Sequence, residues 1–466
     1  MNAKNITLFA GPIAALLTYY LVINTSTAAT STALAITAAV AIICIIWWIF
    51  EPVPIPVTSL LPLAIFQISG VLTKSEIGQA YGSPLILLLL GGFILSRSME
   101  RSGAHLRLAL FMVSLFGNTS SKQLVLGFMV TSAALSMWIS NTATTLMLLP
   151  VALAVANQSK DKQLAIPLML SVAYAASIGG IGTPIGTPPN LVFMQVYEQQ
   201  FDKNIGFTEW MSWGIPIVLC MIPMTWLWLT RKLNYSGGFD MPDVGRWSTI
   251  EKRVMTVFAL TATAWITRKE PFGGWSSWLD LPTANDASVA LIAVILMFVI
   301  PAGYESKERR HEKLLDWDTA VTIPWGILLL FGGGITLAKA FGVSGLSAAI
   351  AENLSGLSAL PVLAMIFAIC LGVTFLTEVT SNTASTVLLM PVLAATAMGS
   401  DIDPRLLMIP AAISASCAFM MPVATPPNSI VYASGFLSTR IMAREGFVLN
   451  ISGAVIITLL CYLLLV

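Results

Sequence analysis

Two short polar motifs stand out because each occurs twice in a chain that is otherwise strongly apolar. The tripeptide Ser-Asn-Thr occupies 140–142 and 381–383, and the tetrapeptide Thr-Pro-Pro-Asn occupies 187–190 and 425–428. Hydroxyl, amide and main-chain oxygens are neutral ligands for a hard cation such as Na⁺, whereas the N–H groups at a helix N-terminus attract anions. The motifs therefore predict a neutral oxygen cage for a monovalent cation in each copy, beside groups that attract an anion.

The duplicated motifs belong to an internal repeat. The stretch 140–152 matches 381–393 at a shift of 241 residues, and the Gly-Gly pair at 91–92 matches the pair at 332–333 at the same shift. The two Thr-Pro-Pro-Asn motifs are separated by a shift of 238 residues. Three motifs in the same order at nearly equal offsets indicate that the chain consists of two related halves.

Composition restricts the class of protein that carries these motifs. Of the 466 residues, 56% are hydrophobic and only 10% are charged, which excludes ordinary soluble domains and disordered chains. The 24 basic and 23 acidic residues leave a net charge of +1, so nucleic acid is not indicated as a partner. The five cysteines show no Cys-x-x-Cys spacing and the two histidines lie far apart, which argues against disulfides and a zinc site.

Apolar runs long enough to cross about 30 Å of hydrocarbon recur along the whole chain. They predict an all-α polytopic membrane protein with eleven transmembrane helices, at 8–24, 33–50, 53–72, 83–100, 164–198, 208–229, 247–267, 286–303, 322–340, 404–434 and 445–466. The two segments that carry Ser-Asn-Thr, 123–158 and 360–399, are predicted to be re-entrant helical hairpins. Their return arms have 16 residues each, about 24 Å of helix, which is too short to span.

The distribution of basic residues predicts the orientation of these helices. With the N-terminus in the cytoplasm, 18 Lys and Arg residues lie on the cytoplasmic side and 6 lie outside. The C-terminus is then outside the cell. Five crossings separate the two Ser-Asn-Thr segments, so the second half enters the membrane from the opposite face. Such an inverted-topology repeat is typical of secondary transporters with a substrate site near the middle of the membrane.

Two of the predicted spans contain a stretch that cannot be regular helix. The segment 179–190 holds four glycines and three prolines, and 421–428 has the same character. We expect each to be an unwound joint between two half-helices, where carbonyl oxygens around Gly186 and Ala424 become available. A hydroxyl one helical turn before each tripeptide, from Ser136 and Thr377, faces the same side as the motif serine. No Arg or Lys lies near the motifs, so an anion would depend on bound cations for countercharge.

A purely structural interpretation competes with this one. Ser, Thr and Asn side chains bridge helices in membranes, and Gly/Pro kinks are common there, so a single motif would favour packing. Two matched pairs in inverted halves favour binding instead. Glu378 is the one acidic residue among the motifs, and its partner at the shift of 241 is Met137. Its carboxylate has either a structural hydrogen-bonding role or a modulating role in cation binding.

The paired motifs, together with the sequence Glu-Pro-Val-Pro-Ile-Pro-Val-Thr at 51–58, resemble the divalent anion:sodium symporter family, also called solute carrier family 13. The resemblance extends from about residue 33 to the end of the chain. It implies eleven transmembrane helices, two re-entrant hairpins, a homodimer and an elevator movement of a transport domain against a scaffold. The implied scaffold is 1–122 and 230–359, and the implied transport domain is 123–229 (hairpin 123–158, broken helix 164–198) and 360–466 (hairpin 360–399, broken helix 404–434).

The resemblance also implies the residues of the sites. It assigns the first sodium site to Ser136, Ser140, Asn141 and the Gly186 carbonyl, and the second to Thr377, Thr380, Asn382 and the Ala424 carbonyl. It assigns the substrate carboxylates to the two tripeptides, Ser140, Asn141, Thr142, Ser381, Asn382 and Thr383, with Thr187, Pro188, Thr425 and Pro426 closing the cavity.

The expected function is symport of sodium with a C4-dicarboxylate such as succinate, malate or fumarate, across a bacterial inner membrane. Both sodium-site patterns are intact, which favours symport over the sodium-independent exchange of some bacterial relatives. A citrate or a sulfate carrier of the same family is the other alternative. No Gly-x-Ser-x-Gly elbow, phosphate-binding loop or metal cluster indicates an enzyme. A channel would need a continuous polar lining rather than two mirrored polar points.

Overall fold

The computed structural model describes residues 3–25, 31–116, 119–159, 161–237, 245–269, 273–304, 309, 311–354 and 361–466. Residue 360, the predicted start of the second hairpin, lies outside these residues. The regular elements of the described residues are all helices, and they are, in chain order, α1 (Ala3–Thr25), α2 (Ser31–Phe50), α3 (Ile55–Thr58), α4 (Leu61–Ser69), α5 (Lys74–Tyr81), α6 (Pro84–Ser102), α7 (Ala104–Leu115), α8 (Ser121–Ser136), α9 (Asn141–Gln158), α10 (Ala165–Gly179), η1 (Gly180–Gly182), α11 (Pro188–Phe201), α12 (Phe207–Thr230), α13 (Thr249–Ile266), α14 (Gly274–Trp278), α15 (Asp286–Val299), α16 (Trp317–Ala320), α17 (Trp325–Val343), α18 (Leu346–Leu354), α19 (Val362–Thr377), α20 (Asn382–Ser400), α21 (Arg405–Ala415), α22 (Pro426–Tyr432) and α23 (Thr439–Leu465).

Within the described residues, eight helices are long and apolar enough to cross a membrane, namely Ile6–Thr25, Thr32–Phe50, Lys74–Ser102, Ala165–Gly182, Phe207–Thr230, Trp325–Val343, Asn382–Ser400 and Thr439–Leu465. One of them, Asn382–Ser400, has 19 residues and contains the return arm 384–399, so the prediction that this arm is too short to span is wrong. The predicted span 247–267 forms the 18-residue helix α13, which carries three charged residues near its start. The predicted spans 286–303 and 404–434 form helices that are shorter or interrupted. The predicted span 53–72 is divided into α3 and α4, and α4 alone covers only about 14 Å. Pro56 and Pro62 lie in the first turns of these two helices, where proline is tolerated.

Both Ser-Asn-Thr motifs begin a helix. The Ser140 Oγ accepts a hydrogen bond from the Ala143 N–H at 3.2 Å, and the Ser381 Oγ accepts one from the Ala384 N–H at 3.4 Å. A serine in this position caps the first turn of its helix, because it satisfies an N–H that has no partner within the helix. The predicted hairpins are therefore two helices each, α8–α9 and α19–α20, joined at a capped tip.

The Thr-Pro-Pro-Asn motifs also begin helices, as the predicted joints require. The chain leaves helical geometry after α10 and resumes it at Pro188, and it does the same after α21, resuming at Pro426. Proline fits the first helical position because its missing N–H would have no partner there. The long spans 164–198 and 404–434 are thus broken helices, as expected from their composition.

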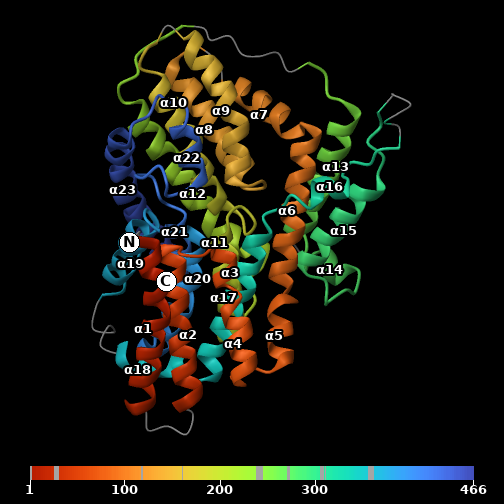
Figure 1. Ribbon diagram of the computed structural model, residues 1–466. Coiled ribbons are helices and arrows are strands. Elements are labelled where there is room, and N and C mark those ends of the chain that lie inside the picture. Colours follow the sequence, from red (N-terminus) through yellow and green to blue (C-terminus); the bar gives the residue numbers. More distant parts are fainter. Residues whose placement is uncertain are drawn as a thin grey trace.

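The two halves of the chain are interleaved rather than side by side. The half-helix α11 of the first repeat packs on α20 of the second, and α22 of the second repeat packs on α9 of the first. Figure 1 shows α8, α9 and α10 at one end of the molecule and α1, α2, α4 and α18 at the other, with α11, α20 and α21 between them. This exchange of half-helices brings the four motifs together at the centre.

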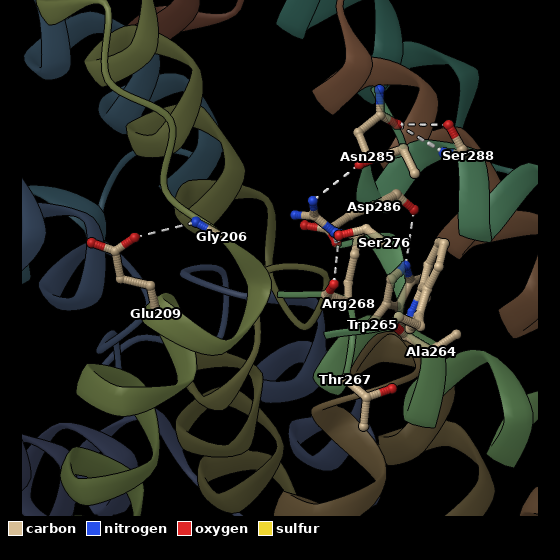
Figure 2. A network of polar contacts seen from close by, with 12 residues as sticks. Gly206, Glu209, Ala264, Trp265, Thr267, Arg268, Ser276, Asn285, Asp286 and Ser288 are labelled. Carbon is tan, nitrogen blue, oxygen red and sulfur yellow. Dashed lines mark hydrogen bonds and ion pairs between the residues drawn. The ribbon is translucent and has the colours of Figure 1, made fainter. Parts of the chain in front are cut away.

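A buried ion pair joins α13 to α15 on one flank of the molecule. The Arg268 Nε donates to the Asp286 Oδ1 at 2.6 Å, and the Trp265 Nε1 donates to the Asp286 carbonyl at 2.9 Å (Figure 2). Both members of the ion pair are largely buried, with 8% and 11% of their side chains exposed. These contacts link the end of α13 to the start of α15, and loss of one charged partner would leave the other buried without a countercharge.

Candidate substrate and cation site

A cavity of about 380 Å³ lies where the four motifs meet. Nine of the ten predicted substrate residues line it, namely Ser140, Asn141, Thr142, Asn382, Thr383, Thr187, Pro188, Thr425 and Pro426. Ser381 is not among the lining residues. The volume falls within the range of small-molecule sites, which bury most of a ligand's surface. The fold therefore brings both repeats of both motifs to one cavity, as their pairing predicts.

The first predicted cation site has converging oxygens. The Ser136 Oγ donates a hydrogen bond to the Asn141 Oδ1, which ties the end of α8 to the start of α9. A Cβ placed on Gly180 would lie 2.8 Å from the Asn141 Oδ1 and 3.0 Å from the Gly186 carbonyl oxygen. Both oxygens therefore border the space beside Gly180, and the Asn141 Nδ2 lies 3.3 Å from the same Cβ position. Neutral oxygens of this kind are suitable ligands for a hard cation, and the absence of a side chain at Gly180 leaves room for the two groups to approach each other.

The second predicted site is arranged differently. The Thr377 Oγ1 donates to the Ala415 carbonyl at 3.0 Å, and the Thr380 Oγ1 donates to the Leu376 carbonyl at 2.8 Å. The Asn382 Oδ1 accepts from the Thr383 N–H at 2.8 Å. Several of these oxygens already have protein partners, and Ala424 lies outside the cavity lining. The side-chain oxygens assigned to this site thus already take part in hydrogen bonds with the protein.

The asparagine of each Thr-Pro-Pro-Asn motif holds its own joint together. The Asn190 Nδ2 donates to the carbonyls of Gly180 and Thr183 at 2.9 and 2.8 Å. The Asn428 Nδ2 donates to the carbonyls of residues 418 and 421, both at 3.0 Å. Donor and acceptors in the second half are each 238 residues beyond those in the first. The repeat found in the sequence therefore extends to individual hydrogen bonds.

Two carbonyls related by the same shift each accept a hydrogen bond from an aromatic side chain, although the two donors are not related by that shift. The Trp210 Nε1 donates to the Ile181 carbonyl at 2.8 Å, and the Tyr174 hydroxyl donates to the Phe419 carbonyl at 2.7 Å. Ile181 and Phe419 occupy equivalent places in the two joints. An unwound joint leaves carbonyls without helical partners, and a buried carbonyl without a partner is costly. Aromatic donors from neighbouring helices remove that cost in both halves.

Glu378 has a structural role in the second joint. Its carboxylate accepts hydrogen bonds from the N–H groups of Phe419, Met420 and Met421 at 2.7–2.9 Å, and from the Asn450 Nδ2 at 2.7 Å. The side chain does not line the cavity. In the first half the Thr183 hydroxyl makes the corresponding link, by donating to the carbonyl of Met137. The acidic residue thus connects the hairpin tip to the joint, which is the structural alternative raised by its position.

The cavity also has a charged wall that the sequence did not reveal. Arg97 and Glu100 of α6 line it, with 2.5 Å between the Arg97 Nη1 and the Glu100 Oε2. The Arg97 Nη2 donates to the Thr322 carbonyl at 2.9 Å. The expectation that no cationic residue lies near the motifs is therefore wrong. Arg97 is more than forty residues from the nearest motif, and only the packing of α6 brings it to the cavity.

Two serines of the cavity wall were also missed. Ser177 and Ser416 line it, and each has a buried Oγ with no hydrogen-bond partner among the described residues. They lie ten and nine residues before the threonines of the two Thr-Pro-Pro-Asn motifs. A serine at nearly the same distance before each Thr-Pro-Pro-Asn motif was the sequence signal that could have identified them. Unpaired buried hydroxyls in a cavity are available to a ligand, since an unsatisfied polar group costs free energy.

Comparisons with known proteins agree with this architecture. The family described as citrate transporter matches residues 45–407. The sodium-dependent dicarboxylate transporter SdcS of Staphylococcus aureus is 39% identical over 438 residues, which is 89% of this chain and 83% of SdcS.

Two solved structures have a similar fold. The YdaH transporter of Alcanivorax borkumensis has a TM-score of 0.60 at 15% identity, covering 86% of this chain and 88% of that one. MtrF of Neisseria gonorrhoeae has a TM-score of 0.59 at 13% identity, covering 86% and 83%. The relatives are transporters rather than enzymes, and the apolar helices make this chain an integral membrane protein. With most of its length matched, the chain belongs to the citrate transporter family, of the divalent anion:sodium symporter type.

Proposed function

We propose that this protein is a sodium-coupled symporter of C4-dicarboxylates such as succinate, malate and fumarate. The observation that carries the proposal is the single cavity lined by both Ser-Asn-Thr tips and both Thr-Pro-Pro joints. The name of the relative SdcS supports sodium as the coupling ion and a dicarboxylate as the substrate. Substrate and sodium would be the small-molecule partners of the protein.

Sodium at the first site would be held by Asn141, Ser136 and the Gly186 carbonyl, with Ser140 at the capped tip. The second site would use Thr377, Thr380, Asn382 and the Ala424 carbonyl after a rearrangement of their present hydrogen bonds. Bound sodium supplies positive charge to a cavity whose motif groups are neutral. The affinity for an anion then rises with sodium occupancy, because opposite charges attract strongly in a partly desolvated site.

The substrate carboxylates would lie against the two helix tips. Asn141 and Thr142 offer an amide and a hydroxyl from one tip, and Asn382 and Thr383 offer the same groups from the other. The N-termini of α9, α11 and α20 also point positive dipole ends toward the middle of the molecule. A C4-dicarboxylate has two separated negative groups, which suits two separated sets of donors.

Transport would follow an elevator movement. The transport domain would be 123–229 with 360–466, and the scaffold would be 1–122 with 230–359. Eleven transmembrane helices, two re-entrant hairpins and a homodimer complete this architecture. The cavity reaches Arg97 and Glu100, which the distribution of basic residues puts on the cytoplasmic side together with the N-terminus. The conformation described here would then face inward, with the C-terminus outside the cell.

The test is uptake of radiolabelled succinate into proteoliposomes that contain the purified protein. An inward sodium gradient should drive accumulation, and replacement of sodium by potassium should abolish it. Uptake in both buffers, dependent on dicarboxylate loaded inside, would replace symport by exchange. No uptake in either buffer would exclude C4-dicarboxylates and lead to citrate and sulfate as substrates.

A further inference from the structure

The two halves of the repeat meet the rest of the protein differently. Helix α6 of the first half corresponds to α17 of the second, because the glycine pairs at 91–92 and 332–333 match. The helices α11 and α20 pack directly on α17. Their counterparts α22 and α9 line the substrate cavity together with α6 and make no comparably extensive contact with α6. The side of the molecule between α6 and the helices α9 and α22 is therefore open. The equivalent side, between α17 and the helices α20 and α11, is closed.

The closed side is tightly packed. A Cβ on Gly334 of α17 would lie 2.4 Å from the Cγ1 of Val387 in α20. Only about 10 Å³ of free volume remains there, between Val192, Gln195 and Val196 of α11, residues of α17, and Val387. That space is too small for a water-filled path, whereas the corresponding cavity beside α6 has about 380 Å³.

Two hydrogen bonds on the closed side connect α11 to other helices, one to the start of α6 and one to α17. The Ser83 Oγ, at the start of α6, donates to the Gln195 Oε1 of α11. The Gln200 Nε2 of α11 donates to the Ala338 carbonyl of α17 at 2.9 Å. Ser83 and Gln195 are 6% and 5% exposed, so their contact is sealed from solvent. Both glutamines are on one helix of the proposed transport domain, and both partners are in the proposed scaffold.

The repeat relates these contacts to the open mouth of the cavity. At the shift of 241 residues, Arg97 corresponds to Ala338, and Pro324 corresponds to Ser83. Arg97 and Pro324 both line the open cavity. Ala338 and Ser83, which take part in the hydrogen bonds on the closed side, are thus the counterparts of Arg97 and Pro324, which flank the open cavity.

We infer that the external access route to the substrate site runs between α17 and α11. In the present conformation the hydrogen bonds Gln195–Ser83 and Gln200–Ala338 close it. These bonds form in the inward-facing state and break when the site faces outward. In the outward-facing state the route would be lined by the residues that correspond, at the shift of 241, to those lining the present cavity. Leu337, the counterpart of Ser96, is one of them. The inference rests on the proposed alternating movement and adds the position of the second opening and the residues that close it.

The glutamines act as positioning residues, because they stabilise one conformation without lining the described cavity. The loss of one hydrogen bond between protein groups changes a conformational equilibrium by about 3- to 10-fold. Gln195→Met and Gln200→Leu should each shift the population toward the outward-facing state by such a factor. Gln199→Leu is the matched control. Gln199 is on the same helix and is half-buried like Gln200, and its Oε1 has no hydrogen-bond partner among the described residues.

The experiment measures the labelling of one introduced cysteine by a membrane-impermeant maleimide, in a protein whose other four native cysteines are buried. Cys220, the exposed cysteine of the described chain, is first replaced by serine. Leu337→Cys then reports the external route, and Ser96→Cys, labelled from the cytoplasmic side, reports the open cavity. The labelling needs neither substrate nor sodium, so it remains informative if succinate is not transported.

Each glutamine variant should raise the external labelling rate of Leu337→Cys by 3- to 10-fold and lower the labelling of Ser96→Cys, while Gln199→Leu changes neither rate. Equal rates at Leu337→Cys in the parent, the two glutamine variants and the control would overturn the inference. A monodisperse size-exclusion profile and an unchanged melting temperature show that each variant is folded. Absence of succinate uptake in the parent, with the labelling changes present, would refute the proposed substrate and leave the access route standing.

Discussion

Substitution of Gly180 by alanine tests the first cation site most directly. The added Cβ would lie 2.8 Å from the Asn141 Oδ1 and 3.0 Å from the Gly186 carbonyl oxygen. Ordinary contacts of a Cβ are 3.4–4 Å, so these oxygens would have to move by about 0.4–0.6 Å. The methyl group would therefore displace both oxygens from the positions in which they would hold a cation.

The size of the effect follows from the two ligands lost. An interaction of a neutral polar group with a charged one contributes about 1.5–3 kcal/mol. Two such interactions amount to about 3–6 kcal/mol, which weakens binding by roughly 10²- to 10⁴-fold. We therefore expect the sodium concentration for half-maximal succinate uptake to rise at least 100-fold in Gly180→Ala.

The assay is a sodium titration of succinate uptake in proteoliposomes, with sodium-dependent thermal stabilisation of the purified protein as a second readout. Gly182→Ala is the control in the same turn, because its Cβ would meet the flexible side chain of Met137 rather than the site oxygens. The control should keep a sodium dependence close to that of the parent. A Gly180→Ala variant that is folded and has the parent's half-saturating sodium concentration would refute the assignment of Asn141 and Gly186 to the cation.

Three further predictions concern the motifs and their supports. Asn141→Ala and Asn382→Ala should each abolish uptake while the protein stays monodisperse, and normal uptake by both would contradict the proposed substrate site. Glu378→Gln should lower the melting temperature and cost about 2–4 kcal/mol, because an amide cannot accept all four donors that the carboxylate now holds, while half-saturating sodium stays within about twofold. An unchanged melting temperature would refute its structural role. Asn190→Leu and Asn428→Leu should destabilise the protein by similar amounts, about 2–4 kcal/mol each, since each removes two donors to buried carbonyls. A large effect in one half alone, measured by thermal unfolding, would show that the two joints are not equivalent.

Much of the site could be predicted because its local geometry is encoded locally. Serine capped the helix tip at Ser140 and Ser381, and proline started the half-helices at Pro188 and Pro426, for reasons confined to a few neighbouring residues. Because the Ser-Asn-Thr and Thr-Pro-Pro-Asn motifs each occur twice, the serine caps and the asparagine hydrogen bonds also occur twice. The pairing of the motifs in one cavity followed from the same repeat, because equivalent joints in interleaved halves meet at the centre.

The tertiary structure decided what depends on contacts between distant segments. Arg97 reaches the cavity only through the packing of α6, and Glu378 finds its four donors across more than forty residues and on another helix. The sequence predicted two similar halves, but Ser83 and Ala338 are in contact with α11 while Pro324 and Arg97 flank an open cavity. Similar local sequences fold alike because their hydrogen bonds are satisfied nearby. Which of two equivalent faces is closed depends on long-range packing, where small free-energy differences between conformations select one arrangement.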